Sequence, residues 1–262
     1  MNNLIREKLF RVQENENKIH FILANTSISE GTLVKGAVVA RKNPYHNYGH
    51  ALGATEYAIK LAIAEGLTPQ EINILGLSMI FHDAGHRGRV HLYDEMRAVQ
   101  LADEILDLSD TQCVHGYTRE SVTQNMRNLI LDTMFPDARG QKLNPLARIV
   151  QDADLAHLGQ GPEYWVWASM GLIEEFNLNR LHPLTPQDFI VDEQEKFVNF
   201  LAKLSGSGDV YLSAGAKKIF RNPLEDVLAV KKYSLQAIEY AYNVRYEDVT
   251  LDEFKKQLLQ FA

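Results

Sequence analysis

An almost wholly apolar run at residues 75–81 ends abruptly in polar residues, first His82 and Asp83 and then His86. The order Thr-Pro-Gln-Glu at 68–71 places a helix cap, a first-turn proline and a capping-box acid just before this run. This start signal predicts a buried helix rather than a strand over residues 72–81. Burying an imidazole beside a carboxylate is costly unless both are hydrogen-bonded, paired or bound to a cation. The end of this helix is therefore a candidate metal site.

Other helices are indicated by apolar residues that recur at intervals of three and four. From 47 to 65 the pattern is helical, and Gly66 stands where a C-terminal cap belongs. A second capping box at 250–253 opens the last amphipathic helix. Further helices are predicted at residues 3–24 (one or two helices), 95–108, 119–134, 146–158, 163–176, 193–204 and 223–243. The predicted fold class is therefore all-α.

One segment departs from the helical pattern. Residues 31–40 are rich in β-branched side chains and bracketed by glycine, so they are the best strand candidate, and they could equally form an extended loop. We expect at most a short strand or extended segment near residues 32–40. The chain has no repeat or convincing linker, because the Gly/Ser-rich stretch at 204–208 is too short to separate domains. We expect a single domain over residues 1–262.

Composition narrows the classes of function. Hydrophobic residues make up 45% and charged residues 23% of the 262 residues, as in ordinary globular proteins. The net charge of −7 and the lack of any Lys/Arg cluster longer than a pair argue against binding of extended nucleic acid. No apolar stretch approaches the roughly 20 residues that span a bilayer. Because Cys113 is the single cysteine and the early residues do not resemble a signal peptide, we expect a cytoplasmic protein.

Four of the nine histidines form two pairs with the same spacing, His46 with His50 and His82 with His86. Residues four apart lie one turn apart on a helix, so a helical pair can aim at one point. Gly85 indicates that the second helix is ending before His86. His50 and His82 are 32 residues apart, which allows two antiparallel helices to bring both pairs together.

Two carboxylates, Asp152 and Asp154, interrupt another apolar helical segment. Because they are two residues apart, they point to different faces of a helix, and only one is expected to reach a metal directly. With His50, His82 and Asp83, Asp154 would make a mixed nitrogen and oxygen shell suited to Zn, Mn, Fe or Mg.

Three motifs in order, Tyr-His-Asn-Tyr-Gly-His-Ala at 45–51, Phe-His-Asp-Ala-Gly-His at 81–86 and Ala-Asp-Leu at 153–155, resemble the HD superfamily of metal-dependent phosphohydrolases. The first motif is similar to that of class I cyclic nucleotide phosphodiesterases and to that of small bacterial HD hydrolases. The resemblance implies an HD-type helical bundle with a metal-site core at about residues 45–155. Helices within 160–262 would complete the pocket.

The resemblance also implies two divalent metal ions (Zn, Mn, Mg or Fe), the tighter one bound by His50, His82, Asp83 and Asp154. Asp83 would bridge to the second ion, His46 would be the general acid, and His86 would support the second ion or the phosphate. The Ala-Asp-Leu pattern favours Asp154 over Asp152 as the ligand.

This assignment is chemically coherent. Two divalent ions that share Asp83 can lower the pKa of a bridging water and clamp phosphate oxygens for in-line attack. His46, with an ordinary pKa of about 6.5, can protonate the departing alkoxide. Loss of His46 should slow the chemistry and spare the metal, whereas loss of Asp83 should cost both.

Residues around the motifs are candidates for supporting roles. Arg87, with Arg89, Arg41 and Lys42, could receive the phosphate, and a solvated loop charge is an equally good interpretation of each one. Hydrogen bonds to the ligands or to bound water are expected from Asn47, Glu95 and Asp152. Glu95 could instead favour the dipole at a helix start.

A candidate base clamp lies further along the chain. Gln194 and Phe197 have the spacing of the glutamine and phenylalanine that grip the base in cyclic nucleotide phosphodiesterases. The match is two residues deep, and a phenylalanine at helical spacing is usually core. Ala84, Gly85 and Arg87 also depart from the phosphodiesterase pattern, which leaves the substrate open.

Together these features predict an enzyme that cleaves a phosphoester of a small nucleotide-like metabolite by metal-activated water. A cyclic nucleotide phosphodiester is the first expectation. A nucleotidase-like phosphomonoesterase and a catalytically weak sensor of metal or nucleotide are the alternatives. The expected partner is a small phosphorylated substrate, and assembly as a homo-oligomer is left open.

Overall fold

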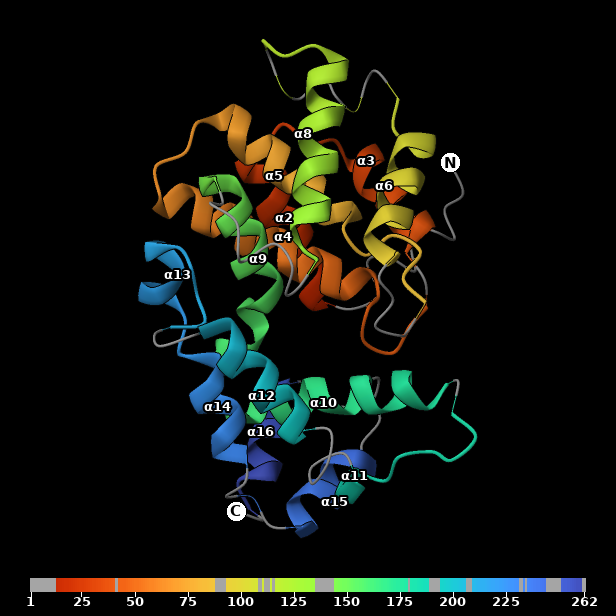
Figure 1. The fold of residues 1–262 in the computed structure, drawn as a ribbon, viewed down its shortest axis with the longest axis vertical. Coiled ribbons are helices and arrows are strands. Elements are labelled where there is room, and N and C mark those ends of the chain that lie inside the picture. The colour runs from red at the N-terminus through yellow and green to blue at the C-terminus, as the bar shows by residue number, and fades with distance from the viewer. Residues whose placement is uncertain are drawn as a thin grey trace. The chain divides into compact units, whose positions relative to one another are not determined.

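The computed structural model describes residues 13–40, 42–87, 93–107, 110, 114, 116–134, 144–178, 180–188, 194–205, 209–230, 233, 235–243 and 251–260. Every regular element in these ranges is a helix, which confirms the all-α prediction (Figure 1). The chain divides into two compact units, of which unit 1 is Met1–Asp154 with Ser213–Ala216 and unit 2 is Leu155–Leu212 with Lys217–Ala262. That these units act as one domain stays a prediction.

Unit 1 is built around helix α5 (Pro69–Phe81), the apolar run of the sequence. Its other helices are α2 (Gln13–Asn25), α3 (Glu30–Val39), α4 (Tyr48–Ala64), α6 (Asp94–Ile105), α8 (Arg119–Asp132) and α9 (Pro145–Leu155), whose last residue belongs to unit 2. Helix α5 packs against α3, α4, α6 and α8, and α4 also packs against α2. Every residue from Ile72 to Phe81 is buried, as expected of a helix that is apolar on all faces.

Local start and stop signals define helix α5 as predicted. The Thr68 hydroxyl accepts a hydrogen bond from the Glu71 backbone N–H, and the Glu71 carboxylate accepts one from the Thr68 N–H at 2.8 Å. Such a cap contributes about 1 kcal/mol. Gly66, which ends the preceding helix region, has a φ of +73°, the left-handed conformation of a glycine cap.

The prediction of a strand or extended segment near residues 32–40 is wrong, because Glu30–Val39 forms helix α3. Ser29 caps the helix by accepting a hydrogen bond from the Thr32 backbone N–H at 3.1 Å. A Cβ at Gly36 would lie 2.5 Å from Ile80 Cγ2, so this glycine permits close packing of α3 against α5. Packing in the folded state outweighs the β propensity of the segment.

Unit 2 contains η2 (Ala156–Gly159), α10 (Pro162–Asn177), α11 (Pro186–Asp188), α12 (Gln194–Ser205), α14 (Pro223–Ala229), α15 (Leu235–Asn243) and α16 (Leu251–Leu258), and α13 (Ala214–Ile219) crosses the unit boundary. Helix α10 packs against α14, α15 and α16. The single long helix predicted at 223–243 is wrong, because α14 and α15 divide it. Tyr233, between them, donates its hydroxyl proton to Glu163 at 2.6 Å. The cap predicted at residue 250 lies outside the described residues.

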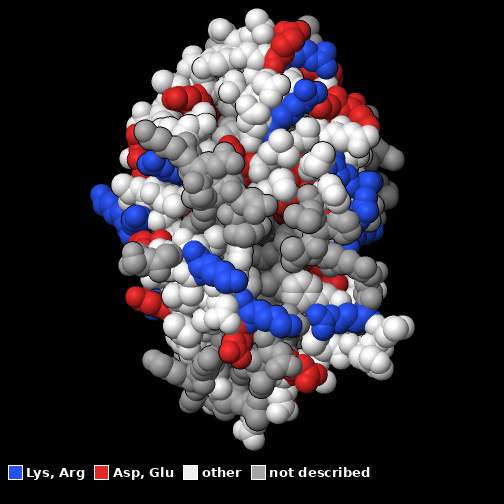
Figure 2. Space-filling model, in the orientation of Figure 1, with Lys and Arg blue, Asp and Glu red and all other residues white. Residues whose placement is uncertain are grey.

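Surface features agree with the composition. On the face drawn in Figure 2, acidic and basic side chains are interspersed among uncharged ones. Within the described parts of the chain, no helix combines the length and apolar character needed to cross a bilayer.

Candidate metal centre

The start of helix α4 fixes the positions of two histidines. The Asn47 side-chain oxygen accepts hydrogen bonds from the backbone N–H groups of Gly49 and His50, at 2.8 and 3.3 Å. Its amide donates to two backbone carbonyls upstream, both at 3.1 Å. His50 therefore lies in the first turn of α4, whereas His46 lies in the loop before the cap. The pair does not share a helical face, and Asn47 joins the segments that carry the two rings.

The end of helix α5 turns sharply after the His-Asp dyad, as Gly85 indicated. His82 is the C-cap residue of α5, and the His86 backbone N–H donates to the Asp83 carbonyl at 3.0 Å. Gly85 has a φ of +72°, and a Cβ there would lie 2.5 Å from Leu101 Cδ1 on α6. Both the backbone conformation and the close approach of α6 thus require glycine at this point.

Four polar side chains from three separate segments meet at the end of α5. The His50 Nε2 atom lies 3.3 Å from Asp83 Oδ2 and 3.2 Å from Asp154 Oδ1. The His82 Nε2 atom lies 3.2 and 3.3 Å from the same two oxygens. The two nitrogens and two oxygens therefore alternate at the corners of a quadrilateral whose four sides measure 3.2–3.3 Å. The structure brings together all four residues that the sequence predicts as metal ligands.

The donor set fits a divalent transition metal. Zinc takes imidazole nitrogen and carboxylate oxygen at about 2.0–2.2 Å, which puts neighbouring ligand atoms roughly 3.0–3.5 Å apart. His82 Nε2 and Asp83 Oδ2 are buried and make no hydrogen bond to the described residues. Leaving two buried polar atoms without hydrogen bonds is costly, and a cation between them removes the cost.

The His82 ring is oriented for ligation through Nε2. Its Nδ1–H donates to the Met79 carbonyl at 2.8 Å, and such a bond selects which nitrogen faces the metal. Burial alone would lower the pKa of His82, but the negative charges of Asp83 and Asp154 hold that pKa well above its ordinary value. The centre therefore favours a positive charge, which a proton or a metal ion can supply.

The two carboxylates respond in the opposite direction. Burial would raise the pKa of Asp83, yet the charge of His82 and the nearby His46 and His50 hold it well below its ordinary value. Burial likewise opposes ionisation of Asp154, but a hydrogen bond with His50 and the charges of His82 and His50 lower its pKa. Both groups are thus ionised, the form that binds metal.

The candidate acid His46 lies beside the four ligands. Its ring stacks on that of His86, with centroids 3.9 Å apart and an interplanar angle of 26°. It also meets His50 edge-on at 5.7 Å. His46 and His86, the two motif histidines that are not among the four proposed ligands, therefore form one stacked pair.

An acid that the sequence analysis missed, Asp94, supports this pair. Its Oδ2 lies 3.7 Å from His86 Nε2, and the residue is only 5% exposed. The sequence pointed instead to the neighbouring Glu95, whose pKa is raised by burial and by the negative charges of Asp83 and Asp154. Both acids begin α6, and only the packing of that helix shows which one contacts His86.

Asp152 has a structural partner. Its Oδ2 accepts a hydrogen bond from the Ser213 backbone N–H at 2.7 Å, and the side chain is fully buried. Asp154, two residues later, faces His50 and His82. The structure therefore separates the two carboxylates as the helix geometry predicts.

The structure describes two of the four predicted phosphate-binding cations. Arg87 and Lys42 are exposed, and Arg41 and Arg89 lie outside the described residues. The role of Arg87 in binding substrate stays a prediction.

The predicted base clamp belongs to unit 2. The side chain of Gln194 lies outside the described part of the structure. Phe197 stacks on Trp165, with ring centroids 4.6 Å apart, and Trp165 is 1% exposed. This contact is what core packing produces, and the clamp stays a prediction.

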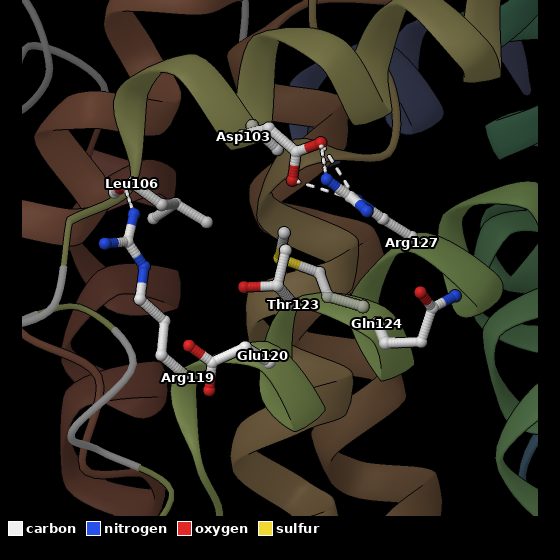
Figure 3. A pocket seen from close by; sticks show the side chains of 9 residues that line it. Asp103, Leu106, Arg119, Glu120, Thr123, Gln124 and Arg127 are labelled. Atoms are coloured by element: carbon white, nitrogen blue, oxygen red, sulfur yellow. Dashed lines mark hydrogen bonds and ion pairs between the residues drawn. The ribbon is translucent and has the colours of Figure 1, made fainter.

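A separate cavity of about 380 Å³ lies between α6 and α8 in unit 1 (Figure 3). Arg127 and Asp103 form a two-pronged pair at its edge, with nitrogen to oxygen distances from 2.6 to 3.1 Å. None of the predicted site residues lines this cavity.

Comparisons with known proteins show similarity of fold. No family model and no curated protein matches the sequence. Among solved structures, LmjPDEB1 in complex with IBMX is similar at 17% identity and a TM-score of 0.57, covering 87% of this chain and 83% of that one.

The phosphodiesterase domain of rhodopsin phosphodiesterase from Salpingoeca rosetta is similar at 18% identity and a TM-score of 0.56, covering 92% of this chain and 84% of that one. The phosphodiesterase domain of the RhoPDE fusion protein from the same choanoflagellate gives 19% identity, a TM-score of 0.55 and coverage of 94% and 89%. The chain therefore has the helical fold of phosphodiesterase domains.

Proposed function

We propose that the chain is a metal-dependent phosphohydrolase of the HD type that cleaves a phosphoester of a small nucleotide. A cyclic nucleotide phosphodiester is the leading substrate. The observation that carries the proposal is the closed arrangement of His50, His82, Asp83 and Asp154, in which two buried atoms make no hydrogen bond. The fold shared with phosphodiesterase domains supports it.

The four ligands would hold a divalent ion, and Asp83 would bridge to a second one. When bound, such ions lower the pKa of water and attract phosphate oxygens. Asp83 and Asp154 contribute ionised oxygens, and the Met79 carbonyl keeps the His82 ring turned so that Nε2 faces the carboxylates. These residues thus orient the phosphate and lower the barrier electrostatically.

His46 would donate a proton to the departing oxygen of the ester. It lies in the loop that Asn47 ties to α4, and the stacked ring of His86 restricts its orientation. The Nε2 atom of His86 in turn lies 3.7 Å from Asp94 Oδ2. A positioned acid of this kind contributes about 10²- to 10⁴-fold to the rate.

A panel of substrates tests the proposal. The protein would be incubated with Mn or Zn and then with cyclic nucleotides, nucleoside monophosphates and generic phosphoesters. Ring-opened nucleotide identifies a phosphodiesterase, and released phosphate identifies a phosphomonoesterase, which the departures at Ala84 and Gly85 keep as second candidate. Binding without turnover across the panel would replace the enzyme with a sensor. Elemental analysis that finds no bound metal would refute the central claim.

A further inference from the structure

Arg97 on α6 lies against the turn that follows the His-Asp dyad. If Gly85 carried a Cβ, that atom would be 2.8 Å from Arg97 Nε and 3.3 Å from Arg97 Cδ. The arginine side chain therefore covers the glycine that lies between Asp83 and His86 in this turn. No cation was predicted at this position, because in sequence Arg97 is eleven residues past His86.

Arg97 also shares a helix face with the acid of the stacked histidine pair. Asp94 precedes it by three residues, which places both side chains on one side of α6. Asp94 Oδ2 lies 3.7 Å from His86 Nε2, so this face of α6 is turned toward the stacked pair of His86 and His46. Arg97 is partly buried on this face of α6, whereas Arg87 is exposed.

Within the described part of the chain, the Arg97 side chain has no hydrogen-bond or ion-pair partner. Its Nε is buried without a hydrogen bond, and the described residues give the side chain no ion pair. Arg127 on α8 shows how this protein satisfies a structural arginine, with three short contacts to Asp103 (Figure 3). A partly buried cation without a counterpart is costly, and an anionic ligand removes that cost.

We propose that Arg97 binds an oxygen of the phosphate group that occupies the metal centre. This inference rests on the proposed function, and it assigns the phosphate-binding cation to α6 rather than to the loops. A planar guanidinium with several donors matches the geometry of phosphate oxygens. A phosphomonoester or free phosphate carries more negative charge than a diester, so Arg97 should hold product more firmly than diester substrate.

Binding of inorganic phosphate to the metal-loaded protein tests the assignment by calorimetry, without requiring turnover. We expect Arg97→Ala and Arg97→Met to weaken phosphate binding about tenfold or more, the usual worth of a charged hydrogen bond. Arg97→Lys should keep part of the affinity, since it retains the charge and loses the fork. Arg119→Ala is the matched control, because Arg119 lines the cavity of Figure 3 and should leave phosphate binding unchanged.

Each outcome decides between a ligand contact and a structural role. Bound metal that remains at the wild-type amount while phosphate affinity falls supports the proposal. Wild-type phosphate affinity in both Arg97→Ala and Arg97→Met overturns it, as does a loss of metal in parallel with phosphate. If the wild-type protein binds phosphate but hydrolyses no ester, the proposed function fails while the role of Arg97 stands.

Discussion

Two carboxylates of unit 1, Asp110 and Asp83, are treated in opposite ways. Asp110 accepts hydrogen bonds from the Thr32 hydroxyl at 2.7 Å and from the Asp107 backbone N–H at 2.8 Å, and it pairs with Lys35 at 2.5 Å. Among the described residues the buried Oδ2 atom of Asp83 has no hydrogen-bond partner, and it lies 3.3 and 3.2 Å from the Nε2 atoms of His50 and His82. The chain itself satisfies the first carboxylate, whereas the second is arranged for a ligand from outside.

This difference gives a physical criterion for function. A buried charge that the chain satisfies stabilises one conformation, and removing it destabilises the fold. A charge that only neighbouring imidazoles offset contributes less to stability, and it stays available to a cation. Substitution of Asp83 should therefore reduce activity more than stability, and substitution of Asp110 should reduce stability more than activity.

The largest effect is expected from Asp83→Asn. The loss of a ligand shared by both proposed ions should remove bound metal and reduce kcat/KM on the order of 1,000-fold. The metal-free variant should unfold at a somewhat lower temperature than the metal-free wild type, because the protonated His82 ring loses one of its two carboxylate partners. Elemental analysis, kinetics and calorimetric melting measure the three quantities. Full activity in this variant would remove Asp83 from the mechanism.

His46→Ala should have the next largest effect on activity. We expect kcat to fall about 100-fold or more, the contribution of a general acid, with the amount of bound metal unchanged. Substrates with a good leaving group, which need no proton, should lose less. An equal loss for good and poor leaving groups would contradict a role as acid.

Asp110→Asn should reverse the pattern seen for Asp83. We expect a loss of about 2–3 kcal/mol in the free energy of unfolding, because Lys35 loses a buried partner and Thr32 keeps only a weaker acceptor. The specific activity of the folded fraction should equal that of the wild type. Urea denaturation with activity measured on the same samples separates the two effects.

Removal of metal from the wild type should lower stability by about as much as the Asp110→Asn substitution. A chelator should lower the melting temperature of the wild type, since a ligand at 100 times its Kd stabilises a protein by about 2.7 kcal/mol. The same chelator should leave the melting temperature of Asp83→Asn unchanged. A shift of equal size in both proteins would place the metal elsewhere.

Sequence reasoning succeeded where the signals are local. The capping box at Thr68 and the glycine turn at Gly85 act within a few residues, and both occur as predicted. The motif pattern also selected Asp154, whose neighbour Asp152 binds Ser213, 61 residues away, a contact that no local signal reveals.

Sequence reasoning failed where the packing of distant elements determines the structure or the burial of a residue. Gly36 suggested the boundary of a strand, and it instead lets α3 approach Ile80 of α5. The sequence pattern assigned no role to Asp94 or Arg97, because their burial depends on how α6 covers the turn at Gly85. Such residues become visible only when elements distant in the sequence are placed together.

The double role of Asn47 has a consequence for how this centre can change over evolutionary time. One side-chain amide anchors the loop that carries His46 and caps the helix that presents His50. The segments that carry His46 and His50 are therefore linked, since any replacement of Asn47 disturbs both. Descendants of this protein that alter their chemistry are expected to do so through residues such as Arg97, which are free of that linkage.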